Sequence, residues 1–92
     1  MLGGWGESKE ADSEVQGHID SLKNDIQTKT GKTYNTLAAK KYHTQVVNGL
    51  KYKVKVQADD GSHLHVHYHK AAGTGNLTLG DVHEGKHHDE PL

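Results

Sequence analysis

The 92-residue sequence contains no cysteine and no arginine. Without cysteine, the chain cannot form a disulfide framework, a thiolate zinc site or a cysteine nucleophile. Small domains in oxidising compartments often rely on disulfides, so their absence favours a reducing compartment, and we expect a cytoplasmic protein. Eleven lysines against twelve acidic residues give a net charge of −1. With neither a basic excess nor arginine to bind phosphate, we expect no nucleic-acid partner.

The sequence also lacks long apolar stretches. No run approaches the roughly 20 apolar residues that a membrane span needs, so we expect no membrane partner. Residues 1–10 have neither the basic nor the apolar region of a secretory signal peptide, and none is expected. Apolar residues make up 32% of the chain, enough for one sheet covered by one helix. We predict a single domain over residues 1–92, with a flexible N-terminal arm over about 1–11 and a polar C-terminal tail over about 83–92.

One helix is predicted to begin at Ser13 and to end before Gly31. Ser13 and Gln16 have the spacing of a capping box, and glycine is typical just after a helix C-terminus. His18 is assigned to the polar face, and Gly17, a poor helix residue, is expected to allow close packing against a sheet. The apolar stripe of the helix recurs at steps of four, three and four residues: Val15, Ile19, Leu22 and Ile26.

After the helix, the apolar period changes to two, which indicates strands. The first strand is predicted to run from Tyr34 to Val46, with a bulge or bend between Tyr34 and Leu37, where the phase of the alternation slips. Asn48–Gly49 is a strong hairpin signal, and residues 50–58 then alternate between apolar and polar side chains. The alternation predicts a strand with one buried and one solvated face.

Two further strands complete an antiparallel meander. A loop over residues 59–61 joins the second strand to the third. Another loop, residues 71–76, is expected at the same end of the sheet as Val47–Asn48, before a last strand over 77–82. One helix on a four- to five-stranded antiparallel sheet is an α+β architecture. The register that matches apolar faces pairs Val54 with Val66 and Val56 with Leu64.

Four histidines alternate with apolar residues on the third of these strands, and the predicted register places three lysines opposite them. Imidazoles two residues apart can share a metal ion, so adventitious zinc, copper or nickel binding is expected. The facing positive charges argue against a dedicated site, and we expect no metal and no cofactor. Alternatively, the nine histidines form a pH-dependent charge store that moves the net charge from −1 to +8. The four are His63, His65, His67 and His69, and a second group of ligand-type residues is His83, His87, His88 and Asp89.

The segment 45–49 reads Gln-Val-Val-Asn-Gly, and in this context it resembles the Gln-x-Val-x-Gly loop of stefins, the intracellular type of cystatin. Gly3 and Gly4 lie at the same distance upstream as the N-terminal glycines of that family. The tail residues 88–90 and Leu92 resemble the stefin C-terminus, with Pro91 as an insertion. The resemblance covers essentially the whole chain and includes the residues that precede the loop: Tyr34, Leu37, Ala39, Tyr42 and Thr44.

The resemblance implies a cystatin-like fold and reversible, tight-binding inhibition of papain-like cysteine proteases of the cathepsin type. Three pieces at one edge of the sheet would block the protease cleft sterically, with Leu2 in the apolar S2 pocket. The family's second loop usually carries Leu-Pro or Pro-Trp, so the small residues found here predict an affinity about ten- to a hundredfold lower. The protease-binding residues would be Leu2, Gly3 and Gly4 in the arm, Gln45, Val46, Val47, Asn48 and Gly49 in the first loop, and Ala72 and Gly73 in the second.

Two alternatives to inhibition come from other functional classes. An enzyme is not expected, because the chain has no cysteine nucleophile, no arginine and no recognisable carboxylate pair or Ser-His-Asp set. The main alternative is a non-inhibitory cystatin-fold module that binds metal or surfaces through its histidine-rich strand. We expect a monomer. If the first hairpin straightened, two chains could exchange the helix hairpin and form a domain-swapped dimer.

Overall fold

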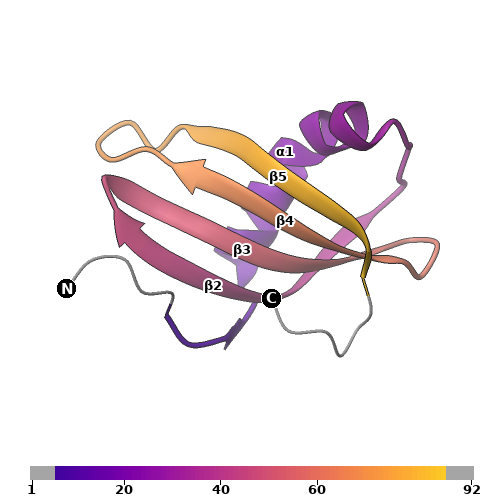
Figure 1. The fold of residues 1–92 in the computed structure, drawn as a ribbon, viewed down its shortest axis with the longest axis horizontal. Coiled ribbons are helices and arrows are strands. Elements are labelled where there is room, and N and C mark those ends of the chain that lie inside the picture. The colour runs from indigo at the N-terminus through magenta and orange to yellow at the C-terminus, as the bar shows by residue number, and fades with distance from the viewer. Residues whose placement is uncertain (1–5, 87–92) are drawn as a thin grey trace.

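One helix lies across one face of a five-stranded antiparallel sheet (Figure 1). The computed structural model describes residues 6–86. Within them, no helix has the length and hydropathy needed to cross a lipid bilayer. The strands follow one another in the sheet in chain order, which confirms the predicted α+β fold class. The elements are β1 (Lys9–Glu10), α1 (Ser13–Thr30), β2 (Leu37–Val47), β3 (Gly49–Ala58), β4 (His63–Lys70) and β5 (Leu77–Lys86).

The helix α1 has the predicted bounds, but its N-terminal cap differs. Asp12 is the N-cap, because its Oδ1 accepts a hydrogen bond of 2.9 Å from the Val15 N–H. The predicted Ser13–Gln16 capping box is wrong: the Gln16 amide instead donates to the Leu37 carbonyl oxygen and accepts from the Ala39 N–H, both at 2.9 Å. Gln16 therefore ties the helix to β2.

Two glycines of the helix have different roles. Gly31 ends the helix as predicted, with φ +75° and its N–H donating to the Gln27 carbonyl oxygen at 2.8 Å. The prediction that Gly17 allows close packing on the sheet is wrong, because Gly17 is exposed and a Cβ built there meets nothing within 4 Å among the described residues. Its position on the helix surface faces solvent.

The core lies between α1 and the covered face of the sheet. The helix supplies the predicted apolar stripe, and the strands supply every second residue of β3 and β4. The register confirms the predicted pairs Val54–Val66 and Val56–Leu64. The buried apolar residues are Val15, Ile19, Leu22, Ile26, Tyr34, Leu37, Tyr52, Val54, Val56, Ala58, Leu64, Val66 and Tyr68.

The predicted phase slip in β2 lies elsewhere in the chain. Tyr34 precedes the strand, and the register shifts between Ala39 and Lys41, so that Lys40 is the extra residue of a β-bulge. The bulge keeps Ala39, opposite Val56, and Tyr42, opposite Val54, on the same face despite their odd spacing. The predicted position of the bulge is wrong because Tyr34 does not belong to the strand, so its spacing from Leu37 carries no information on the strand's alternation.

Both ends of the described chain extend the sheet further than predicted. The arm predicted over about 1–11 is too long, because Gly6 and Ala11 donate backbone hydrogen bonds to the carbonyl oxygens of Thr44 and Lys40, at 2.8 and 2.9 Å. The short strand β1 between them pairs with β2. The tail boundary near residue 83 is too early, because β5 continues to Lys86.

Candidate functional site

Two loops meet at one end of the sheet, one between β2 and β3 and the other between β4 and β5 (Figure 1). The first is a tight hairpin in which Val47 pairs with Gly49, so that Asn48 alone lies outside the strands. The second, residues 71–76, closes with a 2.8 Å hydrogen bond from the Ala71 N–H to the Asn76 carbonyl oxygen. We call residues 45–49 and 71–76 together the loop edge.

Gly49 sits where the two loops touch, and no side chain fits there. Its φ of +98° lies in the left-handed region that favours glycine. A Cβ built on Gly49 would overlap the Lys70 carbonyl oxygen and lie 2.9 Å from the Ala72 nitrogen. The glycine of the Gln-x-Val-x-Gly motif therefore serves both the hairpin turn and the close contact between the loops.

A histidine adds a second link between the first hairpin and β4. His69 Nε2 donates a 2.9 Å hydrogen bond to the Asn48 carbonyl oxygen. From the sequence, His69 is predicted only as one of the four alternating histidines of this strand. Its role depends on the pairing of β4 with β3, which brings position 69 beside Lys51, next to the hairpin.

The apolar surface of the first loop is provided mainly by Val46. Its side chain is 57% exposed, whereas Val47, the predicted apolar contact at the tip, is half-buried. Side chains alternate along a strand, so the two valines point to opposite faces of the sheet. Gln45 is also half-buried and pairs in register with Lys51.

The second loop presents small, exposed residues. Ala72 and Gly73 are both exposed, and Gly73 has φ +82°; within residues 6–86, a Cβ built on Gly73 meets nothing within 4 Å. Proline fixes φ near −65°, so a proline could not adopt the backbone conformation found at this position. The difference from a Leu-Pro loop therefore extends from the side chains to the backbone.

The described chain begins beside the first loop. His43 Nδ1 donates a 2.7 Å hydrogen bond to the Gly6 carbonyl oxygen, in addition to the Gly6–Thr44 backbone hydrogen bond. Gly6 is thus fixed to β2 one residue before the motif at 45–49. The predicted arm residues Leu2, Gly3 and Gly4 lie outside the described residues.

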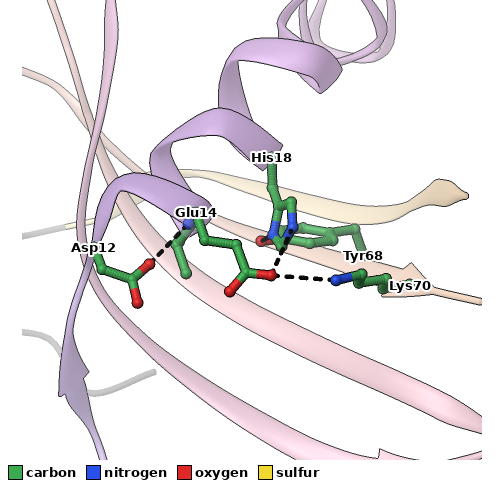
Figure 2. A network of polar contacts seen from close by, with 6 residues as sticks. Asp12, Glu14, His18, Tyr68 and Lys70 are labelled. Carbon is green, nitrogen blue, oxygen red and sulfur yellow. Dashed lines mark hydrogen bonds and ion pairs between the residues drawn. The ribbon is translucent and has the colours of Figure 1, made fainter. Parts of the chain in front are cut away.

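A polar network joins the start of the helix to the end of β4, where the second loop begins (Figure 2). Lys70 Nζ donates to Glu14 Oε2 at 3.2 Å, and His18 Nε2 lies 3.9 Å from the same oxygen. His18 Nδ1 forms a 2.9 Å hydrogen bond with the Tyr68 hydroxyl. The network anchors the strand that leads into the second loop.

His18 is buried, so its assignment to the polar face of the helix is wrong. Its ring packs edge-on against Tyr52 and Tyr68, with centroids 5.1 and 5.5 Å apart. Burial lowers the pKa of His18, partly offset by the Glu14 carboxylate, and burial raises the pKa of Tyr68. The spacing could have revealed this position, because residue 18 follows Val15 by three and precedes Leu22 by four.

The face of the sheet away from the helix, which we call the open face, carries lysines on β3 and histidines on β4, of which Lys55 and His65 are buried. A groove of about 200 Å³ lies among them. Burial, the His83 charge and the Lys53 charge lower the pKa of His67 in this groove, whereas Asp81 raises it. The predicted cross-strand pairs are confirmed: Lys51 with His69, Lys53 with His67 and Lys55 with His65. The groove is lined by Lys51, Tyr52, His67, Tyr68, Gly80 and Asp81.

Comparison with known proteins gives the chain its family. A cystatin domain model matches residues 3–75, a range that includes the whole of the first loop and the residues Ala72 and Gly73. The chain belongs to the cystatin family. Cystatin-A from Felis catus and cystatin-A from Homo sapiens are each 37% identical to it over 92 residues, which is 98% of this chain and 94% of each relative. Cystatin-B from Paralichthys olivaceus is 34% identical over 94 residues, 100% of this chain and 96% of the relative.

These relatives confirm the resemblance to stefins and place this cystatin in a family of cysteine protease inhibitors. A stefin named as such also matches: stefin-C from Bos taurus, 34% identical over 65 residues, which is 71% of this chain and 64% of that relative. The aligned portions of the cystatin-A and cystatin-B relatives include nearly all of this cystatin, so its fold and its loop edge both fall within the shared region.

Proposed function

We propose that this cystatin is a reversible, tight-binding inhibitor of papain-like cysteine proteases of the cathepsin type. In this proposal the arm with Leu2, Gly3 and Gly4 and the two loops of the loop edge fill the protease cleft. The inhibitor works by steric exclusion of substrate, as a monomer rather than as an enzyme. We place it in the cytoplasm, because a chain without cysteine needs no oxidising compartment to fold.

The observation that carries the proposal is the locked contact between the two loops at Gly49. A preorganised surface loses little conformational entropy on binding, which favours tight association. Here Gly49 lies against the backbone of Lys70 and Ala72, and His69 donates a hydrogen bond to the Asn48 carbonyl oxygen. The hairpin therefore presents its motif in one conformation before any protease arrives.

The position of Gly6 supports the third piece of the inhibitory surface. Its hydrogen bonds to β2 start the described chain beside the first loop. A segment of five residues before Gly6 can reach roughly 17 Å when extended, enough to cross several protease subsites. Leu2 is the large aliphatic side chain within that reach, and we assign it to the apolar S2 pocket.

The two loops contribute unequally to binding in this proposal. Val46 is 57% exposed, and burial of this exposed part against a protease would contribute about 1–2 kcal/mol. Ala72 and Gly73 offer only a methyl group and backbone, so the second loop serves mainly to brace the first. The affinity should therefore depend most on the arm and on the first loop.

The test is a titration of papain, and of a cathepsin L-type protease, with the purified monomer. A second protein lacks Met1 to Gly4, and a third carries Val46→Asp. Nanomolar or tighter inhibition is expected for the full chain, with a loss of at least about tenfold for either change, because each removes an apolar anchor. Gly17→Ala is the matched control, because position 17 is on the exposed face of the helix and has open space around it. Absence of inhibition by the full chain at micromolar concentration would refute the proposal.

A further inference from the structure

Three potential metal ligands come together on the open face of the sheet, on two neighbouring strands. His67 lies on β4, and Asp81 and His83 lie on β5. One ligand atom from each of the three side chains lies within 4.8 Å of the other two. The imidazole rings of His67 and His83 touch edge to face, with centroids 5.3 Å apart. This trio is separate from the loop edge.

The trio lies in the pairing of β4 with β5, next to a β-bulge. Val66 pairs with Val82 and Tyr68 pairs with Leu79, so that Gly80 and Asp81 together oppose the single residue His67. A Cβ built on Gly80 would lie 3.2 Å from the His67 carbonyl oxygen, so glycine permits this close approach. His65 pairs with His83 and Val66 pairs with Val82, so the next position of this register sets Asp81 opposite His67, with His83 two residues away on the same face.

We propose that His67, Asp81 and His83 bind a divalent transition-metal ion, with Zn²⁺ as the probe. Two imidazoles and one carboxylate are a three-residue ligand set that leaves a fourth, water-filled position. Zinc holds its nitrogen and oxygen ligands at about 2.0–2.2 Å, which separates neighbouring ligand atoms by roughly 3.4 Å in a tetrahedron. Asp81 and His83 are exposed, so their side chains are free to close this small remaining gap by rotation.

The histidines of β4 alone do not predict this site, because the lysines of β3 face them and the carboxylate ligand, Asp81, comes from β5. On β4, three of the four histidines face a lysine, and Lys53 pairs with His67. Asp81 supplies from β5 both a ligand and a negative charge that offsets this lysine. The neighbouring Lys53 still opposes a cation, so we expect micromolar rather than nanomolar affinity. The fourth position would be open to a water or a small anionic ligand from the groove lined by His67 and Asp81.

The experiment is isothermal titration of the full chain with Zn²⁺ at neutral pH, beside the variants His83→Gln, Asp81→Asn and His63→Gln. We expect one dominant site per chain. The first two variants should weaken it by at least about tenfold, because even outer-shell partners of a metal ligand contribute that much. His63→Gln is the matched control: it removes a histidine from the same face of β4 but leaves the trio complete, and its affinity should stay within about twofold of wild type.

Equal weakening by all three variants, or by none, would overturn the proposal and would indicate binding spread over many surface histidines. Far-UV circular dichroism establishes that each variant is folded. A second measurement distinguishes the ligands directly: the imidazole NMR signals of His67 and His83 should shift first and together as Zn²⁺ is added. If those of His43 or His63 shift first, the assignment is wrong. No protease enters these measurements, so their outcome is independent of the inhibitory function.

Discussion

The substitution Gly49→Ala tests how the two loops of the loop edge are held together. Gly49 has φ +98°, and a Cβ built on it would first meet backbone atoms of Lys70 and Ala72 and then His69 Nε2 at 3.1 Å. An added methyl group cannot be accommodated by a change of rotamer. Either the β4–β5 loop moves away or the hairpin opens, and in both cases the two loops separate.

The expected magnitude has two parts. A residue with a Cβ costs about 1–2 kcal/mol in a left-handed backbone conformation. Forcing an extra group into a filled site costs about 1–3 kcal/mol more. Gly49→Ala should therefore lower the free energy of unfolding by about 2–5 kcal/mol.

Gly61→Ala is the matched control for this prediction. Gly61 also has positive φ, +88°, but a Cβ built there meets no atom within 4 Å. It lies in the loop between β3 and β4, at the far end of the sheet from the loop edge (Figure 1). A hydrogen bond of 2.8 Å from the Ala58 N–H to the Ser62 carbonyl oxygen closes this loop. Gly61→Ala should thus lose only the backbone contribution, about 1–2 kcal/mol.

The assays are urea unfolding of each variant and titration of papain at a temperature where both variants are folded. Gly49→Ala should weaken inhibition by more than about tenfold, while Gly61→Ala should inhibit like the wild type. Equal stability losses in the two variants would show that the contact with Lys70 and Ala72 is not restrictive. Wild-type inhibition by a folded Gly49→Ala would refute the preorganised loop edge.

Three further predictions concern other positions. Burial lowers the pKa of the His18 imidazole below its ordinary 6.5, so the unfolded chain binds a proton at this imidazole more readily than the folded chain does. The contribution of neutral, buried His18 to the free energy of unfolding is complete above about pH 6.5. It falls as the pH drops through that value, by at most about 1.4 kcal/mol per pH unit. His18→Gln should flatten the pH dependence in urea unfolding between pH 7 and 5, and an unchanged slope would contradict the assignment. Gly17→Ala should raise the free energy of unfolding by about 0.5–1 kcal/mol, because position 17 is helical and unobstructed; a loss would reveal a contact there. Ala72→Leu should tighten papain inhibition by about tenfold by adding an apolar anchor, whereas Gly73→Pro should not, because φ +82° excludes proline.

Most of the secondary structure could be predicted from local patterns in the sequence. The spacing of Val15, Ile19, Leu22 and Ile26 located the helix, and Gly31 located its end. Alternation of apolar and polar residues was enough to set the register between β3 and β4, because a shift of one residue would expose every apolar side chain. The hairpin at Asn48–Gly49 followed from turn chemistry. These features depend on local patterns.

Other features depend on which segments become neighbours in the folded chain, and these could not be predicted from the sequence. The bulge at Lys40, the burial of His18 beneath Tyr52 and Tyr68, and the pairing of residues 9–10 with β2 all require knowledge of the facing element. Helical spacing suggested the position of His18, but its polar type argued against burial until a hydroxyl partner was known.

The loop edge and the trio of metal ligands also depend on which segments become neighbours. The motif at residues 45–49 is continuous in the chain and could be recognised directly, whereas its contact with Ala72 joins segments more than twenty residues apart. His67 and Asp81 come together because the pairing of β4 with β5 sets residues fourteen positions apart opposite each other. The register between two strands decides which side chains meet while leaving the local pattern of each strand unchanged, so its consequences are visible in the folded sheet and not in the sequence alone.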